Sequence, residues 1–229
     1  IDTGIRPVLD SAVVDSTAVV VSATATSIVD LADETSTEHT IGTDTVTWPT
    51  GTGLTMIAAD AGAARGLIIH GPSGDVIDTD AFDPNARARY EWSGARSGPS
   101  GRDILVTDSG NFQSVLFSFD RDEPSYFPGL ALAIDDDVVV TAQNVGTEAT
   151  VNVFDHDGQA ISSGATTSVR AALIGGDSIQ LITVGGEIVT MSTSSGDTES
   201  VGRLALGSVE FGVVTTSGDR LVVVGAYGS

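Results

Sequence analysis

Two kinds of β-hairpin alternate along the chain, and this repeat constrains the fold more than any other feature of the sequence. Runs of Val, Ile and Thr are separated by Gly, Asp and Ser, a pattern typical of strands joined by tight turns. Hairpins of the first kind are expected at residues 12–23, 46–59, 90–108, 132–143, 172–184 and 212–226. Hairpins of the second kind are expected between them, at residues 27–41, 66–79, 114–127, 149–162 and 187–201. One hairpin of each kind makes a four-stranded unit that recurs about every 40 residues.

The strands within a unit differ in character. The second strand is nearly continuously apolar, as in AVVV (18–21), DVVV (137–140) and RLVVV (220–224). Such a strand is expected to be covered on both faces. The fourth strands are polar and rich in threonine, which suits an exposed edge. A four-stranded sheet cannot bury both of its own faces, so the units are expected to stack face to face around an axis.

In this architecture the chain resembles the β-propeller superfamily, typified by PQQ-repeat, YVTN-type and WD-repeat proteins. The resemblance extends over the alternating hairpins of essentially the whole chain and includes no specific family motif. It implies an all-β propeller in one domain, residues 1–229. We predict six four-stranded blades, with the N-terminal strand (4–10) closing the last one; five blades plus an extra hairpin is the alternative. The predicted blades are approximately residues 11–43, 44–81, 86–128, 129–164, 168–205, and 208–229 together with 4–10.

The charge balance excludes several classes of partner. The chain carries 31 acidic residues against 10 basic ones, all arginine, and its net charge is −21. Binding to nucleic acid or to an anionic membrane is therefore not expected, because both need a cationic surface. A lysine-free acidic chain fits either a halophile or a bacterium with a GC-rich genome. The sequence has no cysteine, which excludes disulfides, zinc thiolate sites and thiol nucleophiles.

No apolar run is long enough to cross a bilayer, so no membrane insertion by this segment is expected. Because the chain begins with isoleucine rather than methionine, we expect a processed or trimmed product. A signal or anchor could then lie upstream.

Two acidic stretches raise the question of metal binding. In FDHDGQ (154–159), Asp155 and Asp157 are weak calcium candidates because carboxylates are ligands that calcium prefers. The distal glutamate of an EF-hand loop is absent, and Asp and Gly are common in hairpin turns. We therefore interpret this stretch, and DDD (135–137), as turns. Apart from this weak calcium possibility no metal site, cofactor or catalytic residue is predicted.

Turns of both hairpin kinds should emerge on one face of a propeller. That face would collect Asp15, Asp33, Glu34, Asp75, Asp120, Asp122, Glu123, Asp135 to Asp137, Asp155, Asp157, Asp177, Asp197 and Asp219. The histidines His39, His70 and His156 fall in different units and are not expected to converge. A zinc site or a Ser-His-Asp triad is therefore not expected.

One segment interrupts the repeat. Residues 82–103 lengthen the interval between the second and third units and concentrate arginine and large aromatic residues, which often anchor protein interfaces. The predicted partner-binding residues are Arg87, Arg89, Tyr90, Trp92, Arg96 and Arg102. The alternative is that Tyr90 and Trp92 belong to the inner strand of the third blade and that the arginines offset nearby acids.

These observations favour a non-catalytic, extracytoplasmic or cell-surface propeller. It would act as a protein-interaction module or as an accessory subunit of a cell-envelope or surface complex. A propeller enzyme is the alternative, either a calcium-dependent lactonase-like hydrolase or a quinone-dependent dehydrogenase. That alternative requires carboxylates or arginines that converge at the channel mouth.

Overall fold

The computed structural model describes residues 10–14, 17–21, 25–30, 32–33, 35–40, 45–49, 55–59, 67–70, 76–79, 92–204, 209–217 and 220–227. The side chains are described mainly within 92–204. The elements in these ranges are β-strands that form antiparallel sheets, and each sheet follows the chain order. The predicted all-β propeller fold is thereby confirmed.

The first two sheets come from the N-terminal part of the chain. Sheet one contains β1 (Asp10–Val14), β2 (Thr17–Val21), β3 (Ala25–Asp30) and β4 (Thr35–Thr40). Sheet two contains β5 (Thr45–Pro49), β6 (Thr55–Ala59), β7 (Leu67–His70) and β8 (Val76–Asp78).

Three further four-stranded sheets form the middle of the chain. Sheet three contains β9 (Trp92–Ser97), β10 (Asp103–Asp108), β11 (Gln113–Ser118) and β12 (Ser125–Pro128). Sheet four contains β13 (Leu130–Ile134), β14 (Val138–Val145), β15 (Glu148–Asp155) and β16 (Ala160–Thr167). Sheet five contains β17 (Val169–Gly175), β18 (Ser178–Thr183), β19 (Glu187–Ser192) and β20 (Thr198–Arg203). A sixth sheet contains β21 (Val209–Ser217) and β22 (Arg220–Tyr227).

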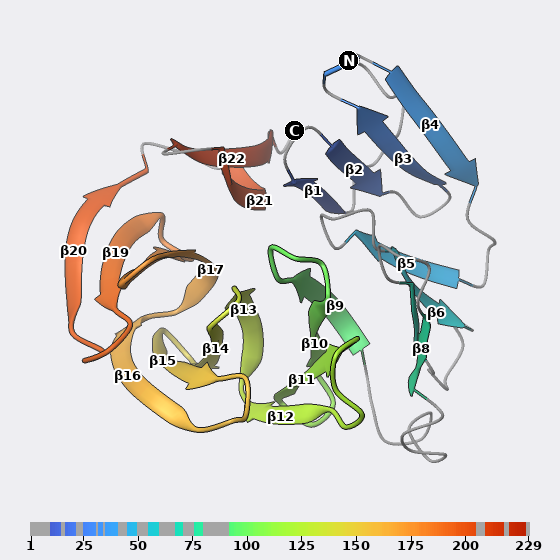
Figure 1. The fold of residues 1–229 in the computed structure, drawn as a ribbon. Helices are drawn as coiled ribbons and strands as arrows, with labels where there is room; N and C mark the ends of the chain where they lie inside the picture. The colour runs from blue at the N-terminus through green and yellow to red at the C-terminus, as the bar shows by residue number, and fades with distance from the viewer. Residues whose placement is uncertain are drawn as a thin grey trace.

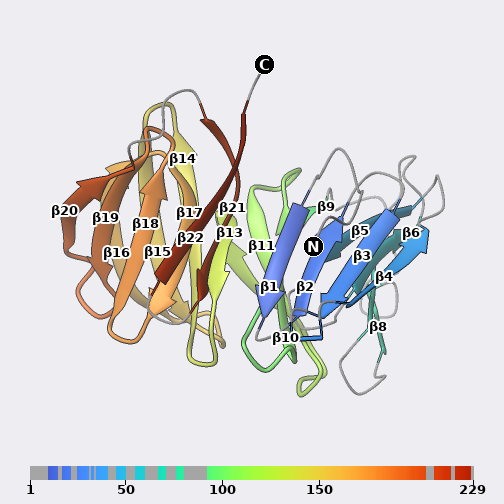
Figure 2. The ribbon, with the colours of Figure 1, turned by 90° about the horizontal axis from the view of Figure 1, so that it is seen from above.

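The sheets are arranged around a common centre, with the first strand of each sheet innermost (Figure 1). These first strands contact one another in order, β1 with β5, β5 with β9, β9 with β13, and β13 with β17. The strand β21 then contacts both β17 and β1. The view from above shows the sheets standing side by side, with their turns at two opposite ends (Figure 2). Every hairpin expected from the sequence corresponds to a pair of these strands.

The number of blades stays a prediction, because the sixth sheet has two strands among the residues described. Of the closing strand predicted at residues 4–10, residues 4–9 lie outside the described ranges. Asp10 pairs with Val21 in sheet one. The predicted closing segment therefore ends before Asp10.

The second strands of sheets three and four are buried on both faces, as their apolar sequences predict. In β10, Ile104 and Val106 pack in a cluster with Ile69 and Ile77 of sheet two. Leu105, between them, points into a different cluster that contains Val139 and Phe154 of sheet four, among other residues. Alternate residues of one strand thus fill the interfaces with both neighbouring sheets.

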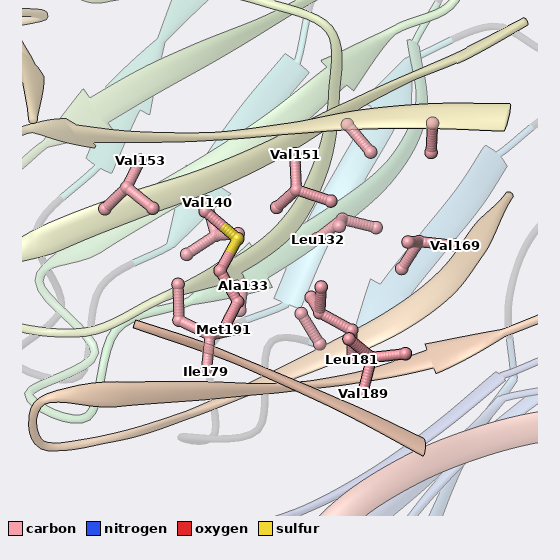
Figure 3. Packing of buried hydrophobic residues seen from close by; sticks show 13 residues of the cluster. Leu132, Ala133, Val140, Val151, Val153, Val169, Ile179, Leu181, Val189 and Met191 are labelled. Atoms are coloured by element: carbon pink, nitrogen blue, oxygen red, sulfur yellow. The ribbon is translucent and has the colours of Figure 1, made fainter. Parts of the chain in front are cut away.

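The interface between sheets four and five is the largest of the described clusters (Figure 3). Val140 and Val151 of sheet four face Ile179, Leu181 and Met191 of sheet five, and all five side chains are buried. Full burial of one such side chain contributes roughly 1.5–3 kcal/mol. This apolar contact between sheets is the main stabilising interaction within the described part of the fold.

The outer edges of sheets four and five approach closely at a glycine. Gly196 has a φ of +78°, and a β-carbon at this position would collide with the backbone of Ser163 in β16. Gly176 also has a positive φ, +61°, but a β-carbon there would meet nothing within 4 Å. Both glycines therefore have a left-handed backbone, but only Gly196 lies against a neighbouring sheet.

We predict that Gly196→Ala destabilises the fold much more than Gly176→Ala. The Gly176 variant should lose only the cost of a left-handed alanine, about 1–2 kcal/mol. The Gly196 variant should lose about 1–3 kcal/mol more, because β16 must move away from sheet five. Urea denaturation of both variants measures the difference. Equal losses would show that the two sheets are not held at this distance.

The closing segment can be tested by truncation. We predict that removing residues 1–9 lowers the melting temperature by more than about 5 °C, because an edge strand of the sixth sheet loses its partner. Removal of residues 1–3 alone, which leaves the predicted closing strand in place, should change it little. Thermal melts of both truncations decide the point, and equal melting temperatures would contradict closure by residues 4–9.

Candidate functional site

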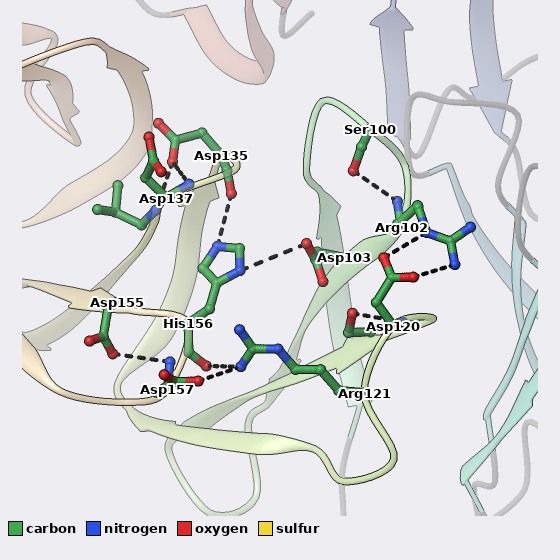
Figure 4. A network of polar contacts seen from close by, with 12 residues as sticks. Ser100, Arg102, Asp103, Asp120, Arg121, Asp135, Asp137, Asp155, His156 and Asp157 are labelled. Atoms are coloured by element: carbon green, nitrogen blue, oxygen red, sulfur yellow. Dashed lines mark hydrogen bonds and ion pairs between the residues drawn. The ribbon is translucent and has the colours of Figure 1, made fainter.

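Polar contacts join sheets three and four at one end of the sheets (Figure 4). The turns between first and second strands, and between third and fourth strands, lie at this end. We call this end of the sheets the acidic face. Among the described residues it carries Asp33, Asp103, Asp120, Asp122, Glu123, Asp135, Asp136, Asp137, Asp155, Asp157, Asp177 and Asp197. Arg102 and Arg121 lie among them. The predicted clustering of acidic turns on one face is therefore confirmed for the part of the chain with described turns.

Arg102 and Asp120 form a two-bond ion pair within sheet three. Arg102 donates from Nε to Oδ2 at 2.7 Å and from Nη2 to Oδ1 at 2.6 Å. Hydrogen bonding from Arg102 holds the pKa of Asp120 below its ordinary value of 3.8. Since a lowered pKa favours the charged form, the pair persists as pH falls and is lost only below the ordinary range of the carboxyl. The Arg102 guanidinium also lies 6.0 Å from the centre of the Phe119 ring.

Arg121 crosses from sheet three to sheet four. Its Nη1 atom donates to the backbone oxygen of His156 and to Oδ1 of Asp157, both at 2.8 Å. The ion pair is largely exposed and contributes little by itself. The bond to the His156 carbonyl fixes the guanidinium against the turn that follows β15.

His156 lies in the same junction and is buried, with 8% of its surface exposed. Its Nε2 atom is 2.9 Å from the backbone oxygen of Asp135. Because a carbonyl oxygen only accepts, Nε2 carries the hydrogen in this bond. The other ring nitrogen, Nδ1, is 3.7 Å from Oδ2 of Asp103 in β10. The imidazole therefore bonds to the Asp135 turn of sheet four and lies close to the start of a central strand in sheet three.

The two acidic stretches are turns, as interpreted from the sequence. Oδ1 of Asp155 accepts hydrogen bonds from the backbone nitrogens of Asp157 and Gln159. Oδ1 of Asp135 likewise accepts from the backbone nitrogens of Asp137 and Val138. Both are the local side-chain bonds that favour aspartate in turns. The two weak calcium candidates thus have a turn role and, for Asp157, an arginine partner.

Within the described ranges, no group of three or more His, Asp or Glu side chains is placed to hold a metal ion. His39 and His70 lie in β4 and β7, in sheets other than that of His156. The predicted separation of the histidines in different sheets is confirmed.

The structure separates the predicted partner-binding residues. Trp92, the first residue of β9, is only 4% exposed and meets Phe117 edge to face at 6.0 Å between ring centres. Its indole is part of the core, in agreement with the alternative interpretation and not with a role as an exposed anchor. Arg102 is paired as described above. Arg87, Arg89 and Tyr90 lie outside the described residues.

Arg96 is exposed on the innermost strand of sheet three, and its Nη1 donates to the backbone oxygen of Ala95 at 2.7 Å. Four residues of extended strand, about 13 Å, separate it from Trp92. Among the described members of the predicted set, Arg96 and Arg102 lie toward the acidic face and Trp92 at the other end of β9. These three residues do not form one patch.

Sequence reasoning missed the role of His156 as a link between sheets. A signal was available, because the turns that hold Asp135 and His156 were predicted to share a face. It also missed Asp108, a fully buried carboxylate that accepts hydrogen bonds from the side chains of Asn111 and Gln113. Nothing in the repeat pattern distinguishes this aspartate from one in an ordinary turn.

No protein-family model matches the sequence, and no curated protein matches it either. Within the described residues, no helix is long and apolar enough to cross a membrane.

Solved structures do match, over nearly the whole chain. Hsv2 of Kluyveromyces lactis is similar with a TM-score of 0.65 and 15% identity, over 96% of this chain and 71% of that one. The Pan2 WD40 domain of Neurospora crassa gives a TM-score of 0.61 and 14% identity, over 95% of this chain and 71% of that one. BamB of Moraxella catarrhalis gives a TM-score of 0.51 and 12% identity, over 97% of this chain and 83% of that one. At these identities the likeness concerns the fold alone, and it agrees with the sheet arrangement in giving a β-propeller.

Proposed function

We propose that this chain is a non-catalytic protein-interaction module. The proposal rests on one observation: the reactive side chains at the candidate site are engaged in holding turns and neighbouring sheets together. His156 is held by Asp135 and faces Asp103, while Arg121 holds the His156 carbonyl. Asp135 and Asp155 order their own turns. These groups make the junction between two sheets rigid, which suits a scaffold that presents its surface to a partner.

The proposed setting is outside the cytoplasm, as an accessory subunit of a cell-envelope or surface complex. The similarity to BamB and to a WD40 domain supports the propeller fold on which this proposal is built. A surface charge of −21 further favours selective binding, since it repels unrelated acidic proteins.

The proposed docking region is the excursion at residues 82–103, without Trp92. Its remaining candidates are Arg87, Arg89, Tyr90, Arg96 and Arg102, the last of which is already paired with Asp120. Arginine suits such a site, because its guanidinium forms paired hydrogen bonds with carboxylates and is weakly hydrated. Arg96 contributes an exposed side chain on the innermost strand of the ring.

We predict that the triple variant Arg87→Ala, Arg89→Ala, Arg96→Ala binds its partner at least about 2 kcal/mol more weakly, the scale of an interface hot spot. A partner would first be recovered from an extract of the source cells with the unaltered protein. Its affinity for both proteins would then be measured by biolayer interferometry.

The matched control replaces the same three arginines with lysine, which keeps the charge and removes the paired geometry. Its affinity should lie between the other two, and all three proteins should melt at similar temperatures. An alanine variant that is folded and binds as tightly as the unaltered protein would contradict this docking region.

A further inference from the structure

Exposed apolar side chains gather at the end of the sheets opposite the acidic face. One lies in or next to each connection between the second and third strands of sheets three, four and five. Phe112 is 72% exposed, Val145 is 78% exposed and Val184 is 58% exposed. We call this surface the apolar turn band, residues 109–112, 143–147 and 183–186 with the linkers 128–130 and 168–170.

Backbone hydrogen bonds tie the linkers of the band to its turns. The linker between sheets three and four donates from Gly129 to the carbonyl of Phe112 at 3.0 Å. The linker between sheets four and five donates from Ser168 to Thr147 at 3.0 Å and accepts from Val184 at 2.8 Å. The turns of sheets four and five are therefore fixed relative to each other through Ser168.

The turn that carries Phe112 is held in an uncommon conformation. Phe112 has a φ of +52°, the only positive φ of a non-glycine residue among those described, and such a backbone is unfavourable for a bulky side chain. The buried carboxylate of Asp108 accepts hydrogen bonds from Asn111 Nδ2 at 2.7 Å and from Gln113 Nε2 at 3.0 Å. These bonds span the turn and keep a phenyl ring in water.

The charges near the band differ from those of the acidic face. Arg170 is the second residue of β17 and Arg203 ends β20, both at the band's end of sheet five. Glu148 and Glu187 begin β15 and β19 at the same end. In the described sheets, both signs of charge therefore surround the apolar side chains at this end, while the opposite end is dominated by carboxylates.

We infer that the apolar turn band is a self-association surface, on which a second copy of this chain docks. A chain with a net charge of −21 repels another copy wherever carboxylates face each other, and in sheets three to five the band carries fewer exposed carboxylates than the acidic face. A two-fold axis places the band of one copy against the band of the other. The arginines of each copy then approach the glutamates of its partner, and the apolar turns are removed from water. None of the residues of the band belongs to the proposed docking region at residues 82–103.

The test is the mass of the protein in solution, measured by sedimentation equilibrium over about a hundredfold range of concentration. We expect the unaltered protein to be a dimer at the upper end of the range. The variant Val145→Asp, Val184→Asp should dissociate at least about tenfold more readily, because each change adds a carboxylate to the apolar contact. The matched control is Ile161→Asp in β16, which is 43% exposed and lies outside the band, and it should remain dimeric.

A milder variant, Val145→Ser with Val184→Ser, guards against loss of the fold, which thermal melts would reveal. It should weaken the dimer in the same direction without adding charge. A protein that is monomeric throughout the concentration range would overturn the inference. So would a dimer that both band variants leave intact, or one that Ile161→Asp disrupts equally.

Discussion

Burial of a second strand on both faces, as in sheets three and four, is the constraint on which the rest of the structure depends. In β10 the side chains of Ile104 and Leu105 enter different clusters, one shared with sheet two and the other with sheet four. One sheet alone cannot provide both environments, so the sheets must stack. Because the innermost strands also contact one another in order around the centre, the stacking closes into a ring rather than an open array.

Because the strands form the core, the turns at the two ends of the sheets can differ in sequence. The core needs only apolar strands and close approach, as at Gly196. At one end of the sheets, aspartates order the turns and link sheets through Arg121 and His156. At the other end, the linkers bond to the turns through backbone groups, and apolar side chains remain in solvent. The ring therefore has two chemically different ends.

Hairpins and faces were predictable from the sequence because they depend on local patterns. Continuous apolar runs mark the second strands, and Asp-Gly stretches mark the turns, so sheets three to five follow the predicted order. The contacts between sheets were not predictable in the same way. Whether Trp92 belongs to the core or to the surface depends on how the neighbouring sheet covers it. The contacts of His156 depend on how sheets three and four are positioned relative to each other. The conformation of Phe112 depends on the carboxylate of Asp108, which no periodicity reveals.

The central claim is that the sheets are stable only as a stacked ring, and amide hydrogen exchange measured residue by residue tests it most directly. If the claim holds, the amides of Leu105, Val140 and Leu181, in the second strands of sheets three, four and five, exchange last and at one common rate set by global unfolding. The outermost strands β12, β16 and β20 exchange earlier. The account is contradicted if one of these sheets exchanges completely while its neighbour remains protected, because each sheet would then be stable by itself.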